Sequence, residues 1–227
     1  MKGRTIMIQI ENICKSFSNG KENVIQALSD VSLTVNDGEM ISVTGPSGSG
    51  KSTLLHIIAM LDTQDSGKYF YNGIDVSAMS ESKKAQIRNR EIGIVLQDYG
   101  LIGEMNALKN VALPLTIAGE TGKAATQRAK DALCAVGLSD KLKQKANLLS
   151  GGQRQRVAIA RAIVMNAKVI LADEPTGAVD SKTTNDIMDL FSSINLKTGA
   201  SIIIVTHDLA AAERCGRKVK IEDGTIS

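Results

Sequence analysis

The sequence predicts an α/β fold in which a mainly parallel β-sheet is joined by an antiparallel β layer and a helical insertion. Short runs rich in β-branched residues recur along the chain and are punctuated by glycine or aspartate, which is typical of strands. Several of these runs are apolar at consecutive positions, as in parallel strands that helices cover on both faces. Between residues 97 and 165 the strand signals fade and helical patterns take their place.

The expected strands follow from these runs. The earliest of them are expected to form the antiparallel layer, and the later ones the parallel sheet. In chain order, strands are expected at residues 6–10, 31–35, 40–43, 92–96, 169–172, 201–206 and 218–222.

The expected helices carry apolar residues at helical spacing. The last of them also contains good helix formers and begins behind a serine at the N-cap position. In chain order, helices are expected at residues 53–60, 107–112, 123–136 and 153–165.

No proline-rich, serine-rich or repetitive linker flanks the helical block. We therefore expect one domain over residues 1–227 with two lobes. Residues 1–97 and 166–227 form the core lobe, and residues 98–165 form the helical lobe.

Composition excludes several classes of protein. The chain has 227 residues, 43% of them hydrophobic and 22% charged, so it can bury a core and is neither disordered nor fibrous. A net charge of +3 is too small to indicate a nucleic-acid-binding surface by itself. Aromatic residues make up only 3%, which leaves few platforms for base stacking. We expect no nucleic-acid partner.

The cysteines, histidines and apolar runs exclude further classes. The three cysteines lie far apart and form no CxxC, so neither a disulfide framework nor a thiolate zinc site is indicated, and a reducing cytoplasm fits best. The two histidines match no metal-binding spacing. The longest apolar runs are far shorter than the roughly 18 residues of a membrane span.

A phosphate-binding loop is the strongest motif. It matches GxxxxGK[ST], follows the strand at 40–43 and precedes the helix at 53–60; its residues are Gly45, Pro46, Ser47, Gly48, Ser49, Gly50, Lys51 and Ser52. Glycines let the backbone N–H groups turn toward one anion, and the helix dipole adds to the same point. We expect Lys51 to reach the β- and γ-phosphates, Ser52 to bind Mg²⁺, and Thr53 to contact the α-phosphate. The alternative, an ordinary Gly/Ser turn, rarely combines with this context.

Two acidic residues end the apolar strand at 169–172. Neighbouring residues on a strand point to opposite sides, so Asp173 can hold Mg²⁺ while Glu174 faces a water that attacks the γ-phosphate. Taken alone, such a pair is more often a solvated turn. The upstream phosphate loop favours the catalytic interpretation.

A second glycine pair starts the helix at 153–165. The residues are Leu149, Ser150, Gly151, Gly152 and Gln153, with Ser150 at the N-cap position. Free N–H donors and the dipole end make this a second candidate anion site. A simple capped helix is an equal alternative by local pattern alone.

Along the chain the phosphate loop comes first, the glycine-pair motif second and the acidic strand end third. In this order they resemble the motifs of the ATP-binding cassette (ABC) ATPases, and the resemblance covers nearly the whole chain. It implies the ABC ATPase fold, which has a P-loop NTPase core. Gln97, after the strand at 92–96, resembles the Q-loop glutamine, and His207 resembles the switch histidine. In isolation, Gln97 would be read as a loop residue and His207 as a capping or core histidine.

The resemblance also implies roles for these residues. ATP and Mg²⁺ are bound between two copies in an ATP-dependent, head-to-tail homodimer, with Ser150 to Gln153 of one copy facing the loop of the other. Gln97 contacts Mg²⁺ and the attacking water, Glu174 polarises that water and His207 contacts the γ-phosphate. The catalytic set is thus Glu174, His207 and Gln97, and the metal set is Ser52, Gln97 and Asp173.

Three further positions are matched by resemblance. Asp180 resembles the D-loop aspartate that couples the two nucleotide sites. Phe17 takes the place of the adenine-stacking aromatic residue, often tyrosine, and keeps a stacking face without the hydroxyl. Val179 replaces the usual leucine of the D-loop, a near-isosteric apolar change.

Within the family, the chain resembles the branch of lipoprotein-releasing, macrolide-exporting, cell-division and antimicrobial-peptide-resistance ATPases. The segment 18–26, the pair Leu61–Asp62 and the segment 172–177 carry this resemblance. It implies a separate membrane permease, a peripheral location at the cytoplasmic face of the cell membrane, and a peptide, lipid or drug-like cargo. We expect Tyr99 and Leu101, in the apolar loop at 98–105, to form an exposed docking surface, with burial in the helical lobe as the alternative.

Two other functions would share some of these motifs. One is an ABC protein that acts on DNA or the ribosome, but only 99 residues separate Lys51 from Ser150, too few for a long coiled-coil arm, and there is a single cassette. The other is a degenerate cassette that binds ATP as a scaffold. The presence of every catalytic position argues against it.

Overall fold

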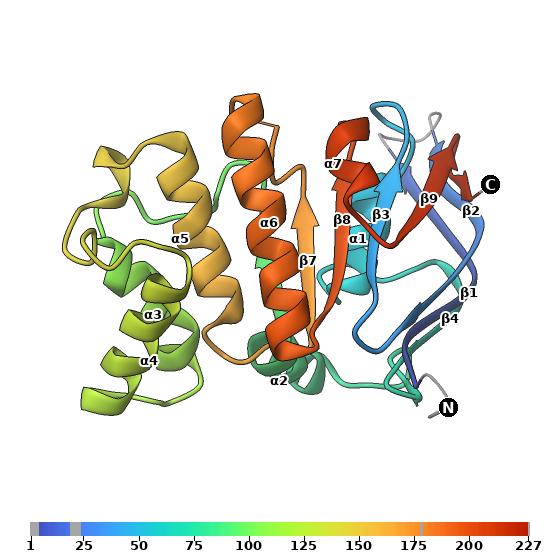
Figure 1. The fold of residues 1–227 in the computed structure, drawn as a ribbon. Helices are drawn as coiled ribbons and strands as arrows, with labels where there is room; N and C mark the ends of the chain where they lie inside the picture. Colours follow the sequence, from blue (N-terminus) through green and yellow to red (C-terminus); the bar gives the residue numbers. More distant parts are fainter. Residues whose placement is uncertain (1–4, 19–23, 178, 227) are drawn as a thin grey trace.

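The computed structural model describes residues 5–18, 24–177 and 179–226. These residues form two β-sheets, with helices packed around the larger one and a separate group of helices at one side (Figure 1). In the described part of the chain, no helix combines the length and the apolar character needed to cross a membrane.

The larger sheet has the strand order β10-β9-β3-β8-β7-β6. Its strands are β3 (Met40–Thr44), β6 (Ile92–Val95), β7 (Val169–Asp173), β8 (Ser201–Thr206), β9 (Arg217–Glu222) and β10 (Thr225–Ile226). All pairings are parallel except that of β10 with β9. The predicted mainly parallel sheet is therefore confirmed, with β10 as an edge hairpin that the sequence does not predict.

The smaller sheet is antiparallel and has the strand order β2-β1-β4-β5. Its strands are β1 (Ile6–Ser18), β2 (Val24–Asn36), β4 (Ser66–Tyr71) and β5 (Ile74–Asp75). The first two contain the expected runs at 6–10 and 31–35 but are much longer, because they pair along most of their length. Residues 19–23 of the segment 18–26 lie outside the described residues.

The helices include all those predicted and three more α-helices. Their bounds are α1 (Lys51–Ile58), α2 (Glu81–Glu91), α3 (Ala107–Ile117), α4 (Gly122–Ala135), the short 3-10 helix η1 (Ala146–Leu148), α5 (Gly151–Ile163), α6 (Ser181–Thr198) and α7 (Leu209–Glu213). Helix α1 begins two residues earlier than expected, since Gly50 adopts a left-handed conformation with φ 100° and starts the helix there. The helices α2, α6 and α7 are additions.

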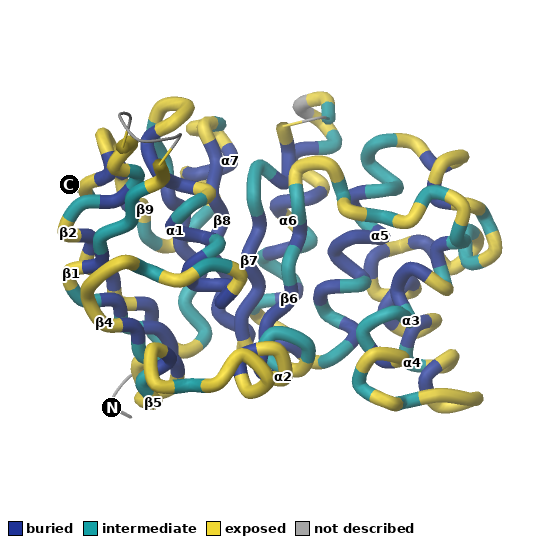
Figure 2. Tube along the Cα trace, turned by 180° about the vertical axis from the view of Figure 1, so that it is seen from behind, coloured by how far each residue is buried: buried dark blue, intermediate teal, exposed yellow. Residues whose placement is uncertain are grey.

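The larger sheet separates two apolar cores. Along β8, Ile203 and Val205 face one core together with α1 and the antiparallel sheet, whereas Ile202 and Ile204 face a second core with α5 and α6. All four are buried. This alternation explains why β8 is apolar at the four consecutive positions 202–205: both faces of the sheet are covered. The strands accordingly form the buried centre of the molecule in Figure 2.

Helix α5 connects the helical group to the sheet. Residues of α3, α4 and α5 share the second core with β7 and β8. At Gly93 of β6, an added Cβ atom would lie 2.3 Å from the backbone oxygen of Ala162, so the backbone of α5 rests directly on the strand. The start of α5 is thereby held at a defined position relative to the sheet.

Candidate nucleotide-binding site

A cleft of about 550 Å³ lies at the carboxyl ends of the parallel strands and the start of α1. Neighbouring parallel strands end at the same edge of a sheet, so the residues that follow β3, β6, β7 and β8 converge there. Its volume is that of a typical small-molecule site. We call it the nucleotide cleft; it is lined by Phe17, Ile25, Ala27, Ser47, Gly48, Gly50, Lys51, Ser52, Thr53, Gln97, Glu174 and His207.

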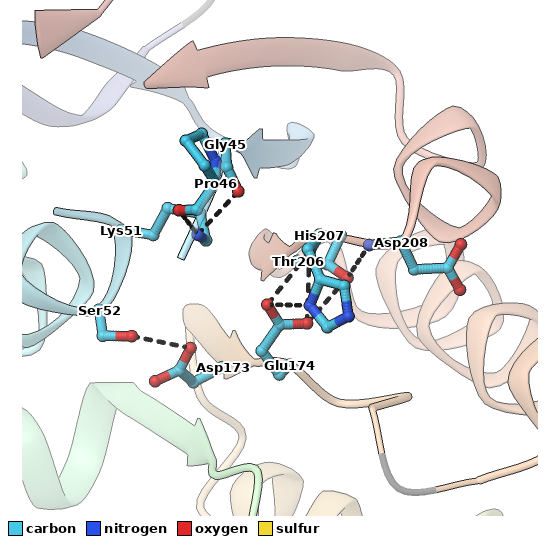
Figure 3. A network of polar contacts seen from close by, with 9 residues as sticks. All are labelled: Gly45, Pro46, Lys51, Ser52, Asp173, Glu174, Thr206, His207 and Asp208. Carbon is cyan, nitrogen blue, oxygen red and sulfur yellow. Dashed lines mark hydrogen bonds and ion pairs between the residues drawn. The ribbon is translucent and has the colours of Figure 1, made fainter. Parts of the chain in front are cut away.

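The phosphate loop between β3 and α1 wraps around the Lys51 side chain. The buried Nζ atom donates to the backbone oxygens of Gly45 at 2.9 Å and Pro46 at 2.7 Å (Figure 3). At Gly50, an added Cβ atom would lie 2.4 Å from the Ala27 oxygen, so only glycine fits beside β2. The first N–H groups of α1 have no partners inside the helix, which makes this end suited to an anion.

Ser52 and Asp173 form the part of the site that fits a magnesium ion. The Ser52 hydroxyl donates to Asp173 Oδ1 at 3.3 Å. Burial raises the pKa of Asp173 above its ordinary value, and the Ser52 hydrogen bond opposes this only in part. A hydroxyl and a carboxylate are hard oxygen ligands, and Mg²⁺ commonly takes one or two of these together with substrate phosphates and water. The described residues contain no cluster of three or more His, Cys, Asp or Glu side chains that could hold a metal without such help.

Glu174 points away from Asp173 and contacts the end of β8 instead (Figure 3). One carboxylate oxygen lies 2.8 Å from Nδ1 of His207 and accepts from the His207 backbone N–H at 3.1 Å, and the other accepts from the Thr206 hydroxyl at 3.1 Å. Glu174 has φ 45°, a left-handed conformation directly after the last residue of β7. The chain therefore turns sharply between the two acidic residues.

Gln97 follows β6 closely and lines the cleft. The loop behind it is held by Arg161 of α5, whose guanidinium donates to the backbone oxygens of Gly100 and, at 2.8 Å, Tyr99. Helix α5, which begins at Gly151, is thus tied directly to the loop that carries Gln97.

The loop at 98–105 differs from the sequence-based expectation. Tyr99 and Leu101 are half-buried and pack against the second core, so the prediction that both are exposed is wrong. Buried Asn110 of α3 exchanges hydrogen bonds with both backbone groups of Ile102, which folds the loop onto the helical group. Only Ile102 is an exposed large apolar residue here.

Phe17 of β1 lines the nucleotide cleft from the antiparallel sheet. It pairs across the antiparallel sheet with Ile25, and Ala27 follows on the same strand. Ile25 and Ala27 are lining residues that the sequence does not predict, because only the strand register places them beside Phe17. The signal available was the apolar run 24–28, which continues into the strand predicted at 31–35.

The glycine-pair motif does not reach the cleft of the same chain. Ser150 accepts from the Gln153 backbone N–H at 3.3 Å, and the Gln153 side chain accepts from the Ser150 N–H at 3.1 Å, so both cap α5. Gly152 packs against Thr183 of α6. Asp180 caps α6 through the Thr183 N–H at 2.9 Å. None of residues 150–153 and 180 lines the nucleotide cleft.

A family model described as ABC transporter matches residues 28–177 of the chain. The chain belongs to the ABC transporter family. It contains an ABC ATPase domain.

Relatives of this ABC ATPase extend the match along the whole chain. It is 47% identical over 220 residues to the ABC transporter ATP-binding protein YknY of Bacillus subtilis, which covers 97% of this chain and 95% of YknY. The fold is similar, with a TM-score of 0.90 and 40% identity over 97% of both chains, to the dimeric ATP-binding cassette MJ0796 solved with ADP and phosphate in a post-hydrolysis state. It also resembles cbiO1 of Clostridium perfringens, part of the cbiONQ complex, with a TM-score of 0.87 and 26% identity over 98% of this chain and 87% of that one.

Proposed function

We propose that this ABC ATPase domain is the ATP-hydrolysing subunit of a transporter and that it drives a separate membrane permease from the cytoplasmic face of the membrane. One observation carries the proposal. A single cleft gathers the phosphate loop, the Ser52 hydroxyl and the side chains of Gln97, Glu174 and His207. These are the groups needed to bind a triphosphate and to position water against it.

The phosphate loop binds the phosphates of the nucleotide, and the part of the cleft around Phe17 binds its base. Lys51 is held by carbonyl oxygens and can exchange these partners for β- and γ-phosphate oxygens. Thr53, on the first turn of α1, serves the α-phosphate. The base lies against Phe17, with Ile25 and Ala27 as additional apolar contacts.

Mg²⁺ fits beside the Ser52 hydroxyl and Asp173, with Gln97 as a third group. When bound, it supplies charge neutralisation on the phosphate oxygens. The chain contributes the oxygen ligands and their spacing across the end of β7 and the start of α1.

Hydrolysis requires a base that can take a proton from the attacking water. Glu174 is suited to this role: water oxygen bonds to the γ-phosphorus, its proton passes to the carboxylate, and the bond to the β-phosphate oxygen breaks to give ADP and phosphate. In the structure both Glu174 oxygens are already occupied by His207 and Thr206. His207 must turn toward the γ-phosphate for Glu174 to face water, so the arrangement favours a catalytic step that follows substrate binding.

A second copy of the chain completes the site. Residues 150–153 lie at the start of α5, in the helical group away from α1 (Figure 1), and do not line the cleft. A head-to-tail homodimer brings these helix N-terminal donors to the γ-phosphate, where negative charge develops. Asp180, at the start of α6, then lies near the boundary between two clefts and can couple them.

A groove between the core and the helical group is proposed as the permease docking site. It has a volume of about 400 Å³ and lies between α2, α3, α5 and β6. Its walls include Leu61, Leu113, Ile117 and Met165. Leu96 lines this groove and the next residue, Gln97, lines the nucleotide cleft. A short helix or loop of the permease with an apolar face would contact Leu96 in this groove. A shift of Gln97 on nucleotide binding would move Leu96, its neighbour in the chain, and so reach the permease.

The remaining parts of the proposal concern lobes and cargo. The core lobe 1–97 and 166–227 carries the nucleotide cleft, and the helical lobe 98–165 carries residues 150–153 for the second copy. We propose export or extracytoplasmic handling of a peptide, lipid or drug-like cargo, which rests on the branch resemblance of segments 18–26 and 172–177. Identification of the co-purified permease from membranes tests this last point.

The function is tested with Glu174→Gln, which keeps the shape of the side chain but cannot accept the proton. Hydrolysis should fall by roughly 10² or more, the contribution of a positioned base. ATP and Mg²⁺ should hold the variant as a dimer in size-exclusion chromatography, whereas ADP should not. Glu213→Gln at the exposed end of α7 is the matched control and should behave as wild type. Normal turnover in Glu174→Gln, or a monomer with ATP, would contradict the proposal.

A further inference from the structure

A lysine lies against the aromatic ring at the base end of the nucleotide cleft. The Lys15 Nζ atom is 5.2 Å from the centre of the Phe17 ring, within the range of a cation–π contact. Lys15 is only 12% exposed at its side chain. Phe17 lines the cleft and Lys15 does not. The ammonium therefore contacts the ring from outside the space that the base would fill.

The same ammonium is held by the segment that follows α1. Nζ donates to Asp62 Oδ1 at 2.8 Å and to the Thr63 backbone oxygen at 2.7 Å, and lies 3.9 Å from Asp65 Oδ1. Asp65 also accepts from the Ser16 backbone N–H at 2.7 Å. Burial alone would raise the pKa of Asp62, but the hydrogen bonds from Lys15 and the Thr63 amide outweigh it and hold that pKa below its ordinary value of 3.8. Asp62 is thus an ionised partner at neutral pH.

These contacts connect the two ends of the nucleotide site. The strand β1 carries Phe17, while α1 begins with Lys51 and Ser52 and is followed by the turn at 59–65. A charge contact between β1 and that turn fixes the aromatic ring relative to the helix that binds the phosphates. The Leu61–Asp62 pair, which marks the branch in the sequence, supplies one of the two carboxylates.

We propose that Lys15 is a positioning residue for nucleotide-base recognition. Its ammonium, held by Asp62 and Asp65, supports one side of the Phe17 ring and leaves the other side for the adenine. The cation also draws electron density from the ring, which favours stacking of a nucleobase on the opposite face. The inference rests on the proposed nucleotide function and deepens it, because it separates base binding from phosphate binding.

The test compares two ligands that share phosphates but differ in the base. The affinities of Mg-ADP and of inorganic pyrophosphate with Mg²⁺ are measured by calorimetry. Where pyrophosphate binds with little heat, its affinity is measured by its displacement of bound ADP. Lys15→Met should weaken ADP binding by about three- to tenfold, the effect of one partly buried cation–π contact, and leave pyrophosphate unchanged. A structural role alone would weaken both ligands or neither, and either result would overturn the inference.

Lys84→Met is the matched control. The Lys84 side chain is 9% exposed and forms a 2.8 Å ion pair with Glu81 in α2, so it resembles Lys15 in burial and pairing, but it makes no cation–π contact within the described residues. Its ADP affinity should equal that of wild type. An ADP loss in this control as large as that of Lys15→Met would show a general effect of removing a buried ion pair and would overturn the inference.

A double-mutant cycle tests whether Lys15 acts through Phe17. In a Phe17→Leu background, Lys15→Met should have no further effect on ADP affinity; an undiminished effect would overturn the proposal.

If Lys15→Met does not fold, Asp62→Asn replaces it. This variant keeps the Lys15 ammonium but removes the Asp62 carboxylate that holds it. A selective loss of ADP affinity is again expected, and an unchanged ratio of ADP to pyrophosphate affinity overturns the inference. If wild type binds neither ligand, the proposed function itself fails.

Discussion

Individual charged residues of the cleft are satisfied by protein partners that a substrate must replace. Lys51 donates to two backbone oxygens of its own loop, and Glu174 is bonded to the end of β8. Burying an unpaired ammonium or carboxylate would be costly, so such pairing stabilises the cleft before a nucleotide enters. The binding energy of ATP is therefore a difference between phosphate contacts and the contacts that it displaces.

Lys51→Met tests this exchange at the residue scale. Methionine has a similar length but no charge, so it loses the ionic hydrogen bonds to phosphate, each of which contributes about 1.5–3 kcal/mol. We expect Mg-ADP affinity to fall by roughly tenfold to a hundredfold or more, measured by calorimetry. Lys145→Met, which removes an exposed ion pair with Glu104, serves as the control. Unchanged ADP affinity in Lys51→Met would contradict the assignment of the loop.

At the scale of elements, the strands of the parallel sheet could be predicted because both of their faces are buried. The runs expected at 169–172 and 201–206 are wholly apolar in the first case and apolar at 202–205 in the second, and each matches a strand within one residue. Helix α2 could not be predicted in the same way: among its residues only Lys84 and Ile87 are buried, so it has no apolar stripe. Helix α6 did carry a signal, with Ile187, Phe191 and Ile194 at helical spacing and Gly199 at its end.

The junction between α5 and β6 yields a prediction for one glycine. Gly93→Ala places a Cβ atom 2.3 Å from the Ala162 backbone oxygen. That oxygen belongs to the backbone of α5, so the clash can be relieved only by displacing the helix. We expect the free energy of unfolding to fall by about 1–3 kcal/mol, as for other overpacked sites, measured by urea denaturation. Gly103→Ala is the control, since its Cβ atom would meet only the Asn147 side chain at an ordinary 3.5 Å. Equal stability of the two variants would show that α5 does not rest on the strand as described.

At the scale of the whole molecule, the cleft arises where separate segments end at one edge of a sheet. The loop at 45–52 and Glu174 could be placed together from the sequence because each follows a recognisable strand, whereas Gln97 and His207 were matched through the family resemblance. The base end of the cleft could not. Ile25 and Ala27 reach it only through the register of β2 against β1, and register depends on turn geometry and bulges that the residues alone do not reveal.

The whole molecule also explains why the apolar side chains of the loop at 98–105 are not fully exposed. Side chains that follow the Q-loop glutamine, Tyr99 and Leu101, are taken up by the second core because α5 and α3 hold this loop from both sides. An open apolar groove lies beside β6 and is lined by Leu96. If the permease docks in this groove, as we propose, coupling to the nucleotide runs through the end of β6 rather than through the tip of the loop.

Ile117→Glu tests whether the permease docks in this groove and is coupled from there to the nucleotide cleft. Ile117, at the end of α3, is 74% exposed and lines the groove, so a charge there should cost little stability. We expect the isolated domain to keep its ATPase rate, because the nucleotide cleft is untouched, and the domain reconstituted with its permease in liposomes to lose transport and permease binding. Leu196→Glu on α6 is the matched control: it is 84% exposed and lies outside the groove, and transport should persist. If both variants transport normally, the permease docks elsewhere; if Ile117→Glu also loses ATPase activity as an isolated domain, the groove supports the catalytic fold rather than a partner.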